Sequence, residues 1–380
     1  MMKTKRHRLK VFCIIGTRPE AIKMAPIIKL MACDPQSFKT TVCVTGQHRE
    51  MLHQALEIFG IIPDVDLKCM TAGQSLTRLT ALLFERIGEV INELKPDWVI
   101  AQGDTTTVFV AAMSAFYCGI RFAHVEAGLR TGDLLNPFPE EVNRTFADTL
   151  SEVCFAPTEY SRNQLLQEGC PAGKVVLTGN TVVDALREIC GLPFRWEDGP
   201  LAAIDRQKRL VLVTAHRRES FGEPIREICR ALRLVAQACV DEGVHVVYPV
   251  HLNPEVREPV VRLLQDITNI SLLEPLDYCS LIQLMRTSEL ILTDSGGIQE
   301  EAPSFHVPVL IMRDKTERPE GVQAGVARLV GTSAELIASS TIDLLRDPQQ
   351  RLSMRCVLNP YGDGRAAERI VAELLSRSNL

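Results

Sequence analysis

The 380-residue sequence lacks several patterns that identify common metal and cofactor sites. None of its twelve cysteines forms a C-x-x-C pair, and none of its eight histidines lies in an H-E-x-x-H motif, so we expect no zinc site. The G-x-G-x-x-G fingerprint and the Walker A sequence are also absent, which disfavours nicotinamide and P-loop chemistry. Most cysteines lie in apolar periodic segments, which indicates small buried side chains in a reducing compartment.

Long hydrophobic runs are absent as well. The longest mostly apolar stretch, residues 108–120, is shorter than the ~18 residues that a membrane-spanning helix needs. The apolar run 11–15 is shorter than the ~7–15 residues of a secretory signal. We therefore expect a cytoplasmic protein with no membrane partner.

Neither sign of charge dominates the sequence. The net charge is −5, with 23% charged and 46% hydrophobic residues, which is typical of a soluble globular protein and disfavours nucleic acid as the main partner. The basic residues within the first ten positions are expected to form a solvated leader. A length of 380 residues predicts two domains.

The sequence does contain a repeated alternation of apolar runs and helical patterns, organised around residues 102–141. The apolar run 98–101 predicts a buried strand, residues 106–117 predict an Ala-rich helix, and residues 121–125 predict a second strand. A loop with Gly and Pro follows, and the next helix begins at residue 140. Because this alternation continues through the first half, we predict a doubly wound parallel sheet.

Three carboxylates lie where these elements meet. Asp104 follows the first of the two strands, Glu126 follows the second, and Glu140 opens the next helix. The carboxyl ends of parallel strands share one edge of a sheet, so these groups are candidates for acid–base catalysis. Asp104 also fits a helix cap, and Glu140 fits a favourable charge at a helix N-terminus. No helix start explains Glu126.

Two turns are suited to an anionic ligand. The strand 10–15 runs into GTRPE, where Arg18 and Lys23 lie beside a helix N-terminus; they suit a pyrophosphate, or are ordinary surface cations. In the second half, the strand 290–293 runs into DSGG, whose glycines leave backbone N–H groups open to a phosphate. The acidic pair that follows, Glu300 and Glu301, suits ribose hydroxyls, or simply caps the helix.

The pattern breaks at GLPFRWEDG, residues 191–199, and a second alternation begins at residue 209. We therefore expect an α/β protein with two Rossmann-like doubly wound domains, residues 1–190 and 200–360, and a cleft between them. His216 lies at the exit of the first strand of the second domain, where it is either catalytic or structural.

Together these motifs resemble those of the non-hydrolysing UDP-N-acetylglucosamine 2-epimerases. They follow in the same order through almost the whole chain: GTRPEAIKMAPI, GQHREML, GDTTT, HVEAGLRTGDL, PFPEE, PTE, GNTVVDAL, AHRRES, HLNP, LTDSGGIQEEAPS, RDKTERPE and NPYGDG. The resemblance implies a fold shared with GT-B nucleotide-sugar glycosyltransferases, a homodimer, and no metal or nicotinamide. It also implies that a C-terminal helix, about 362–380, packs back onto the first domain.

The resemblance also implies roles for single residues. Asp104, Glu126 and Glu140 match the catalytic carboxylates, and His216 matches a histidine needed for activity. The positions that match substrate-binding residues are Arg18, Lys23, Arg144, Ser295, Gly296, Gly297, Glu301 and Arg318. Those that would contact a regulatory second UDP-GlcNAc are Gln47, His48, Arg217 and His251. Leu276 and Leu281 stand where some members place a glutamine and a phenylalanine against the uracil.

The implied reaction inverts C2 of UDP-GlcNAc to give UDP-ManNAc, which feeds surface polysaccharide synthesis. UDP is eliminated with the C2 proton to give 2-acetamidoglucal, and UDP then adds back. Three other functions fit the same fold: a glycosyltransferase that moves the sugar to an acceptor, a hydrolysing relative that releases free ManNAc, and a non-catalytic UDP-sugar sensor.

Overall fold

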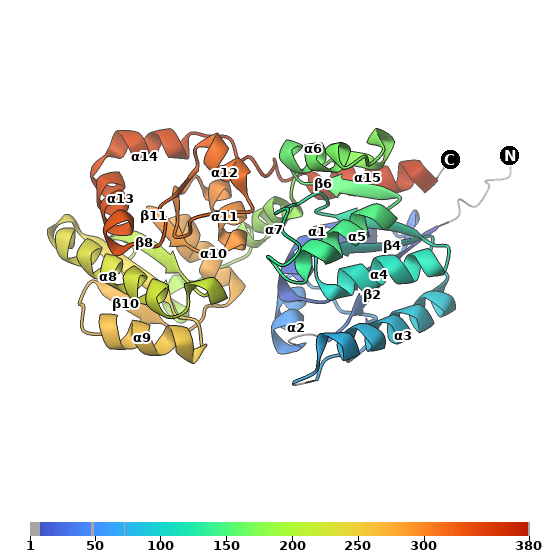
Figure 1. The fold of residues 1–380 in the computed structure, drawn as a ribbon, viewed down its shortest axis with the longest axis horizontal. Coiled ribbons are helices and arrows are strands. Elements are labelled where there is room, and N and C mark those ends of the chain that lie inside the picture. Colours follow the sequence, from blue (N-terminus) through green and yellow to red (C-terminus); the bar gives the residue numbers. More distant parts are fainter. Residues whose placement is uncertain (1–7, 47–48, 72, 379–380) are drawn as a thin grey trace. The chain divides into compact units, whose positions relative to one another are not determined.

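The computed structural model describes residues 8–46, 49–71 and 73–378. The chain forms two compact units (Figure 1). Unit 1 contains the residues up to Arg187 and those from Tyr361 onward, and unit 2 runs from Glu188 to Pro360. Each unit has its own sheet and hydrophobic core.

Among the described residues, unit 1 forms a seven-stranded parallel sheet in the order β3-β2-β1-β4-β5-β6-β7. Its strands are β1 (Leu9–Ile15), β2 (Phe38–Val44), β3 (Val65–Asp66), β4 (Trp98–Gln102), β5 (Arg121–Val125), β6 (Val153–Ala156) and β7 (Val175–Leu177). Its helices are α1 (Arg18–Cys33), α2 (Arg49–Ile58), α3 (Leu76–Leu94), α4 (Thr106–Tyr117), α5 (Glu140–Leu150), α6 (Glu159–Gln167), α7 (Thr181–Cys190) and α15 (Ala366–Ser378). Helix α4 packs against α3 and α5, and α1 packs against α2 and α15.

The described part of unit 2 forms a six-stranded parallel sheet in the order β10-β9-β8-β11-β12-β13. Its strands are β8 (Arg209–Thr214), β9 (Val244–Pro249), β10 (Ile270–Leu273), β11 (Leu290–Thr293), β12 (Val309–Ile311) and β13 (Ala327–Leu329). Its helices are α8 (Glu223–Ala238), α9 (Pro254–Leu264), α10 (Tyr278–Thr287), α11 (Gly296–Glu301), α12 (Pro319–Ala324), α13 (Ala334–Arg346) and α14 (Pro348–Arg355). The two parallel sheets confirm the α/β class predicted from the sequence.

Each sheet has one point where the strand order reverses direction. In unit 1 this point lies between β1 and β4, and in unit 2 it lies between β8 and β11. The loops that leave two such strands diverge toward opposite sides of the sheet, and ligands of doubly wound proteins bind in the crevice that results. The turns after β1 and β4, and those after β8 and β11, are therefore the places to look for function.

Helix α15 returns the chain to unit 1 after unit 2 is complete. Its first amides, Ala366 N–H and Ala367 N–H, donate to the Asp184 carboxylate at 3.2 and 3.0 Å. At its other end, the Ser378 hydroxyl accepts a hydrogen bond from Trp98 Nε1 at 3.0 Å. The helix is thus attached to α7 at its first turn and to β4 at its last turn. None of the described helices is long and apolar enough to cross a lipid bilayer.

Candidate active site

Glu126 lies directly after β5 and is held by two side chains from neighbouring elements. Its Oε2 atom accepts hydrogen bonds from Lys23 Nζ at 2.5 Å and from Gln102 Nε2 at 2.8 Å. Its side chain is 6% exposed, so the charge of Lys23 is the local counter-charge for a buried carboxylate. The backbone of Glu126 has φ of +66°, a conformation that non-glycine residues seldom adopt and that often marks a functional position.

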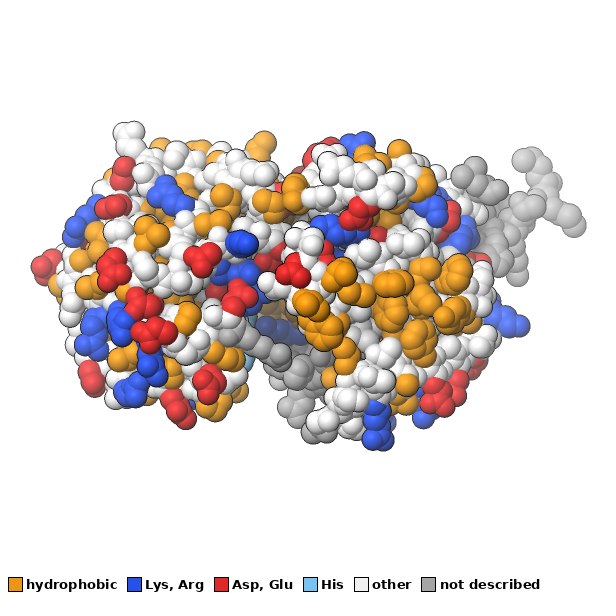
Figure 2. Space-filling view, viewed as in Figure 1, with side chains coloured by type: hydrophobic (Ala, Val, Ile, Leu, Met, Phe, Trp, Pro, Cys, Tyr) orange, Lys and Arg blue, Asp and Glu red, His pale blue; other side chains and the backbone are white. Residues whose placement is uncertain are grey.

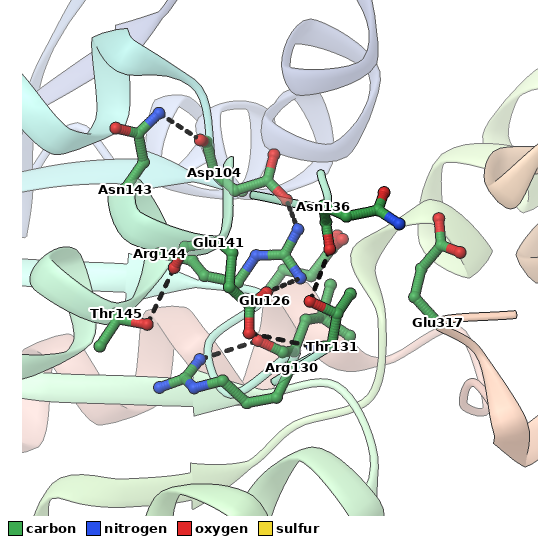
Figure 3. A network of polar contacts seen from close by, with 12 residues as sticks. Asp104, Glu126, Arg130, Thr131, Asn136, Glu141, Asn143, Arg144, Thr145 and Glu317 are labelled. Atoms are coloured by element: carbon green, nitrogen blue, oxygen red, sulfur yellow. Dashed lines mark hydrogen bonds and ion pairs between the residues drawn. The ribbon is translucent and has the colours of Figure 1, made fainter. Parts of the chain in front are cut away.

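Asp104 lies two residues beyond β4, the strand that pairs with β5. Its Oδ2 atom accepts a hydrogen bond from Arg144 Nη2 at 2.6 Å, and its backbone carbonyl accepts one from Asn143 Nδ2 at 2.9 Å (Figure 3). The N-cap of α4 is Thr105, so the interpretation of Asp104 as a helix cap is wrong. The buried Nε atom of Arg144 has no hydrogen-bond partner among the described residues, so this guanidinium retains a donor for a ligand.

The two glutamates that open α5 differ in their surroundings. Glu141 is buried, and its Oε1 atom accepts the N–H groups of Thr131 and Gly132, both at 3.0 Å, which closes the preceding loop. Glu140 is the first residue of α5 and is half-buried. Of this pair, Glu141 therefore has the structural role, and Glu140 remains the candidate for chemistry.

A buried ion network fixes α5 to the end of β5. His124 Nδ1 lies 2.6 Å from Asp148 Oδ1, and its Nε2 lies 2.7 Å from the Gly103 carbonyl oxygen. Both ring nitrogens of His124 therefore face oxygen atoms of neighbouring elements. Burial by itself would raise the pKa of Asp148, but His124 and Arg130 hold it below its ordinary value. The network sets the position of Gly103 and hence of Asp104.

The turn after β1 carries the two cations singled out in the sequence. Lys23 contacts Glu126 as described above, whereas Arg18 is half-buried at the start of α1. Sequence reasoning missed Glu20, which lies between them. Its Oε2 atom accepts the N–H groups of Gly16 at 2.6 Å and of Thr17 at 3.3 Å, and burial raises its pKa to about 7.

In unit 2, Asp294 holds the loop that carries His216. Asp294 follows β11 and is fully buried, and its Oδ2 atom accepts hydrogen bonds from the His216 and Arg217 N–H groups and from the Ser220 hydroxyl, each at 2.9 Å. The His216 ring stacks on that of His251, with centroids 5.7 Å apart. Sequence analysis did not single out Asp294, although it lies within the motif LTDSGGIQEEAPS. Its position directly after a strand is the signal that could have identified it.

An arginine cluster lies beside this loop. Glu317 accepts a hydrogen bond from Arg217 Nη2 at 2.9 Å and one from Arg313 Nη1 at 2.7 Å, and Arg318 Nη1 lies 3.0 Å from it. Burial alone would raise the pKa of Glu317, but Arg318, Arg217 and Arg313 hold it well below its usual range. Three guanidinium groups share this carboxylate, and Arg313 and Arg318 each pair with a second glutamate as well, so the charges of the cluster are balanced.

The DSGG turn brings Gly296 against Arg318. A Cβ atom on Gly296 would lie 2.6 Å from Arg318 Nη1, so the guanidinium lies directly over the turn. Arg318 is fixed there by Glu300, whose Oε1 atom accepts from Nε at 2.6 Å. Glu301 instead accepts a hydrogen bond from the buried Tyr278 hydroxyl at 2.8 Å. Tyr278 is a second residue that the sequence did not single out.

The structure thus brings several of the expected residues into contact. It pairs Lys23 with Glu126, Arg144 with Asp104, and Gly296 with Arg318. Ser295 and Gly297 lie in the same turn as Gly296. Gln47 and His48 lie outside the described residues. No group of three or more His, Cys, Asp or Glu side chains in the described part of the chain could hold a metal ion.

Comparisons with known proteins point to one family. The family model for UDP-N-acetylglucosamine 2-epimerase matches residues 31–375. The UDP-N-acetylglucosamine 2-epimerase of Escherichia coli (strain K12) is 50% identical over 372 residues, which cover 96% of this chain and 98% of that protein. Among solved structures, the Neisseria meningitidis UDP-GlcNAc 2-epimerase bound to UDP-GlcNAc has a TM-score of 0.90 at 44% identity, covering 97% of this chain and 100% of that one. The Methanocaldococcus jannaschii enzyme in complex with UDP-GlcNAc and UDP has a TM-score of 0.81 at 32% identity, with the same coverage.

Proposed function

The chain belongs to the UDP-N-acetylglucosamine 2-epimerase family, and we propose that it interconverts UDP-GlcNAc and UDP-ManNAc by inverting C2 of the sugar. It is therefore an isomerase whose substrate is a nucleotide sugar. The observation that carries this proposal is the pair of carboxylates at the ends of the adjacent strands β4 and β5. Each has its own cation: Arg144 for Asp104, and Lys23 for Glu126.

The reaction proceeds by elimination and re-addition. The C2–H bond and the bond between C1 and the UDP oxygen break, C1 and C2 become doubly bonded in 2-acetamidoglucal, and UDP leaves with the electron pair. Addition of UDP to C1, with protonation of C2 on the opposite face, gives the epimer. A base on one face and an acid on the other are needed, which calls for two carboxylates in different environments.

The carboxylates of unit 1 supply these groups. Glu126 is buried beside Lys23, whereas the Asp104 side chain is 29% exposed beside Arg144, so their environments differ as the reaction requires. Glu140, at the start of α5, is the third candidate. The spare donor of Arg144 suits an oxygen of the sugar or of its acetamido group.

Unit 2 binds the UDP moiety. The backbone of Ser295, Gly296 and Gly297, together with Arg318, suits the diphosphate, and Glu301 suits the ribose hydroxyls. His216 lies at the neighbouring strand exit, where it can stabilise UDP as it departs. Arg318 lies over the Gly296 turn and belongs to the arginine cluster around Glu317, which supports an anionic ligand in this unit.

A second UDP-GlcNAc regulates the enzyme through Arg217 and His251. Arg217 belongs to the arginine cluster, and His251 stacks on His216, so a ligand on either residue acts directly on the catalytic loop. Initial rates should then depend sigmoidally on substrate concentration, and the H251A variant should make the dependence hyperbolic. Sigmoidal kinetics that persist in H251A would remove His251 from this role.

The enzyme works as a cytoplasmic homodimer. Its twelve cysteines are free, as is typical of a reducing compartment. An aromatic surface on unit 1 supports pairing with a second copy (Figure 2). It consists of the exposed Phe116, Tyr117 and Phe146 and of the half-buried Phe84 and Phe109. Its product serves surface polysaccharide synthesis.

Incubation with UDP-GlcNAc in deuterated water, followed by NMR, tests the proposal. We expect UDP-ManNAc that carries deuterium at C2, with no net release of free sugar. Free ManNAc with UDP would indicate a hydrolysing enzyme instead. Tight binding of UDP-GlcNAc without conversion would contradict the epimerase and favour a glycosyltransferase or a sensor.

A further inference from the structure

Glu20 is a buried carboxylate to which the reaction above gives no role. It lies in the first turn of α1 and is only 2% exposed. Burial raises its pKa to about 7, which means that the folded protein disfavours the charged form. A neutral acceptor such as glutamine could bind the same two amides without that cost. Its position in the turn between β1 and α1 therefore calls for an explanation.

The hydrogen bonds of Glu20 change how the start of α1 can bind an anion. The N–H groups of Gly16 and Thr17 would otherwise be among the free donors of the helix N-terminus. Both are taken by Glu20 Oε2, at 2.6 and 3.3 Å. The turn therefore contacts a diphosphate through side chains rather than through these amides, and the placement of Arg18 becomes decisive.

The turn is also confined on its other side. A Cβ atom on Gly16 would lie 2.5 Å from Thr107 Oγ1 and 3.2 Å from Glu20 Oε2, so the Gly16 backbone is fixed between the two side chains. Thr107 belongs to α4, the helix that follows Asp104. Glu20 thus holds the turn against the helix that follows the carboxylate proposed to be catalytic.

The two cations proposed to act at the unit 1 site lie on α1, just after this turn. Arg18 follows Thr17 directly, and Lys23 lies on α1 three residues beyond Glu20, where it donates to Glu126 at 2.5 Å. A change in the way α1 begins would therefore move a substrate-binding cation and the counter-ion of a catalytic carboxylate together.

We propose that Glu20 is a positioning residue of this enzyme: by holding Gly16 and Thr17, it sets where Arg18 and Lys23 meet the substrate and Glu126. The proposal rests on the function proposed above, because the cations matter only if unit 1 acts on a UDP-sugar.

Two substitutions test it in the full-length protein. Glu20→Ala leaves two buried amides without their acceptor, and we expect kcat/KM for UDP-GlcNAc to fall at least tenfold, with both a higher KM and a lower kcat. Glu20→Gln keeps an acceptor oxygen, and we expect kcat/KM within about threefold of the wild type. Rescue by glutamine identifies the hydrogen bonds, rather than the charge, as the basis of the effect.

Asp184 provides a matched control. Its carboxylate also accepts two backbone amides at a helix start, those of Ala366 and Ala367, and burial also raises its pKa. Asp184→Ala should lower thermal stability while the folded enzyme keeps its kcat/KM. If the two alanine variants lose activity in parallel with stability, Glu20 is merely structural and the proposal is overturned.

Two further measurements keep the outcomes distinct. If Glu20→Ala does not fold, the Glu20→Asp variant tests the proposal instead. Its side chain is shorter by one methylene, so the carboxylate lies farther from the Gly16 and Thr17 amides. A wild-type kcat/KM in that variant would contradict the proposal. If the wild type itself shows no turnover, the epimerase function fails, and hydrogen–deuterium exchange becomes the readout. Peptides covering residues 10–25 should then exchange faster in Glu20→Ala but not in Asp184→Ala, and unchanged exchange would overturn the positioning role.

Discussion

The two carboxylates at the ends of β4 and β5, which we propose to be catalytic, differ in their surroundings. Asp104 is the more exposed of the two carboxylates and lies beside an arginine with a spare donor, whereas Glu126 is buried beside Lys23. Solvent can therefore exchange a proton with Asp104 more readily than with Glu126. The side chain of Asp104 is the one whose substitution disturbs its surroundings least.

We expect Asp104→Asn to lower kcat by about a hundredfold or more, since general acid–base catalysis contributes typically 10²–10⁴-fold. UDP binding should persist, because the residues proposed to bind UDP lie mainly in unit 2. Turnover followed by NMR and calorimetry with UDP measure the two effects. Asp97→Asn is a matched control: Asp97 precedes β4, and its Oδ2 accepts the Lys10 N–H at 2.7 Å. Unchanged turnover in Asp104→Asn would remove Asp104 from catalysis.

Glu20 should also affect the pH dependence of stability. Its pKa rises from 4.5 to about 7 on folding, so the folded state binds more protons than the unfolded state between these values. Stability is therefore lost as pH rises through this range, by about 3 kcal/mol in total, and the cost persists above pH 7. Glu20→Gln should raise the melting temperature at pH 8 and have no effect near pH 4. A constant difference across that range would contradict the assignment.

The sequence predicts candidate site residues but not the partners with which they form pairs. Asp104, Glu126 and His216 were found because polar residues at the exits of apolar strands stand out. The Lys23–Glu126 pair joins positions 103 residues apart, which no local pattern encodes. Glu20 resembles an ordinary acidic residue in a first helical turn, and only the structure shows its burial.

At the scale of elements, the strands were the easiest to predict. Strands such as β5, β6, β8 and β11 are buried on both faces of a parallel sheet, so they are nearly continuous apolar runs with clear limits. The edge strands β3 and β13 were missed, because they span only two and three residues and are partly polar. Short edge strands depend on their neighbour in the sheet rather than on their own sequence.

The turn between β11 and α11 leaves so little space beside Gly296 that adding one methyl group tests how Arg318 is placed. A Cβ atom on Gly296 would lie 2.6 Å from Arg318 Nη1, so Gly296→Ala should displace the guanidinium. Because the end of a flexible side chain can move, we expect the fold to persist and the Kd for UDP to rise about tenfold.

Calorimetry measures that affinity, and Gly88→Ala is the control, because a Cβ atom there meets nothing within 4 Å. Wild-type affinity in Gly296→Ala would show that Arg318 does not need this position to bind UDP.

At the scale of the whole molecule, we propose that the aromatic surface of unit 1 forms the interface of a dimer. Phe116, Tyr117 and Phe146 are 60%, 69% and 51% exposed, although large aromatic side chains are usually covered. We expect light scattering to give twice the chain mass for the wild type and the chain mass itself for Phe116→Ser combined with Tyr117→Ser.

Leu352→Ser, at a 60% exposed position in unit 2, should leave the assembly state unchanged. A monomeric wild type, or a double variant that still dimerises, would show that this surface has another purpose.

The return of α15 to unit 1 affects the order in which the two units can fold during synthesis on the ribosome. Unit 2 is continuous in sequence, so all of it has been synthesised before the helix that completes unit 1 appears. Domains usually finish in the order of translation, the N-terminal one first. We expect the reverse order here: unit 1 lacks the hydrogen bonds to Asp184 and the cover over Trp98 until α15 has left the exit tunnel.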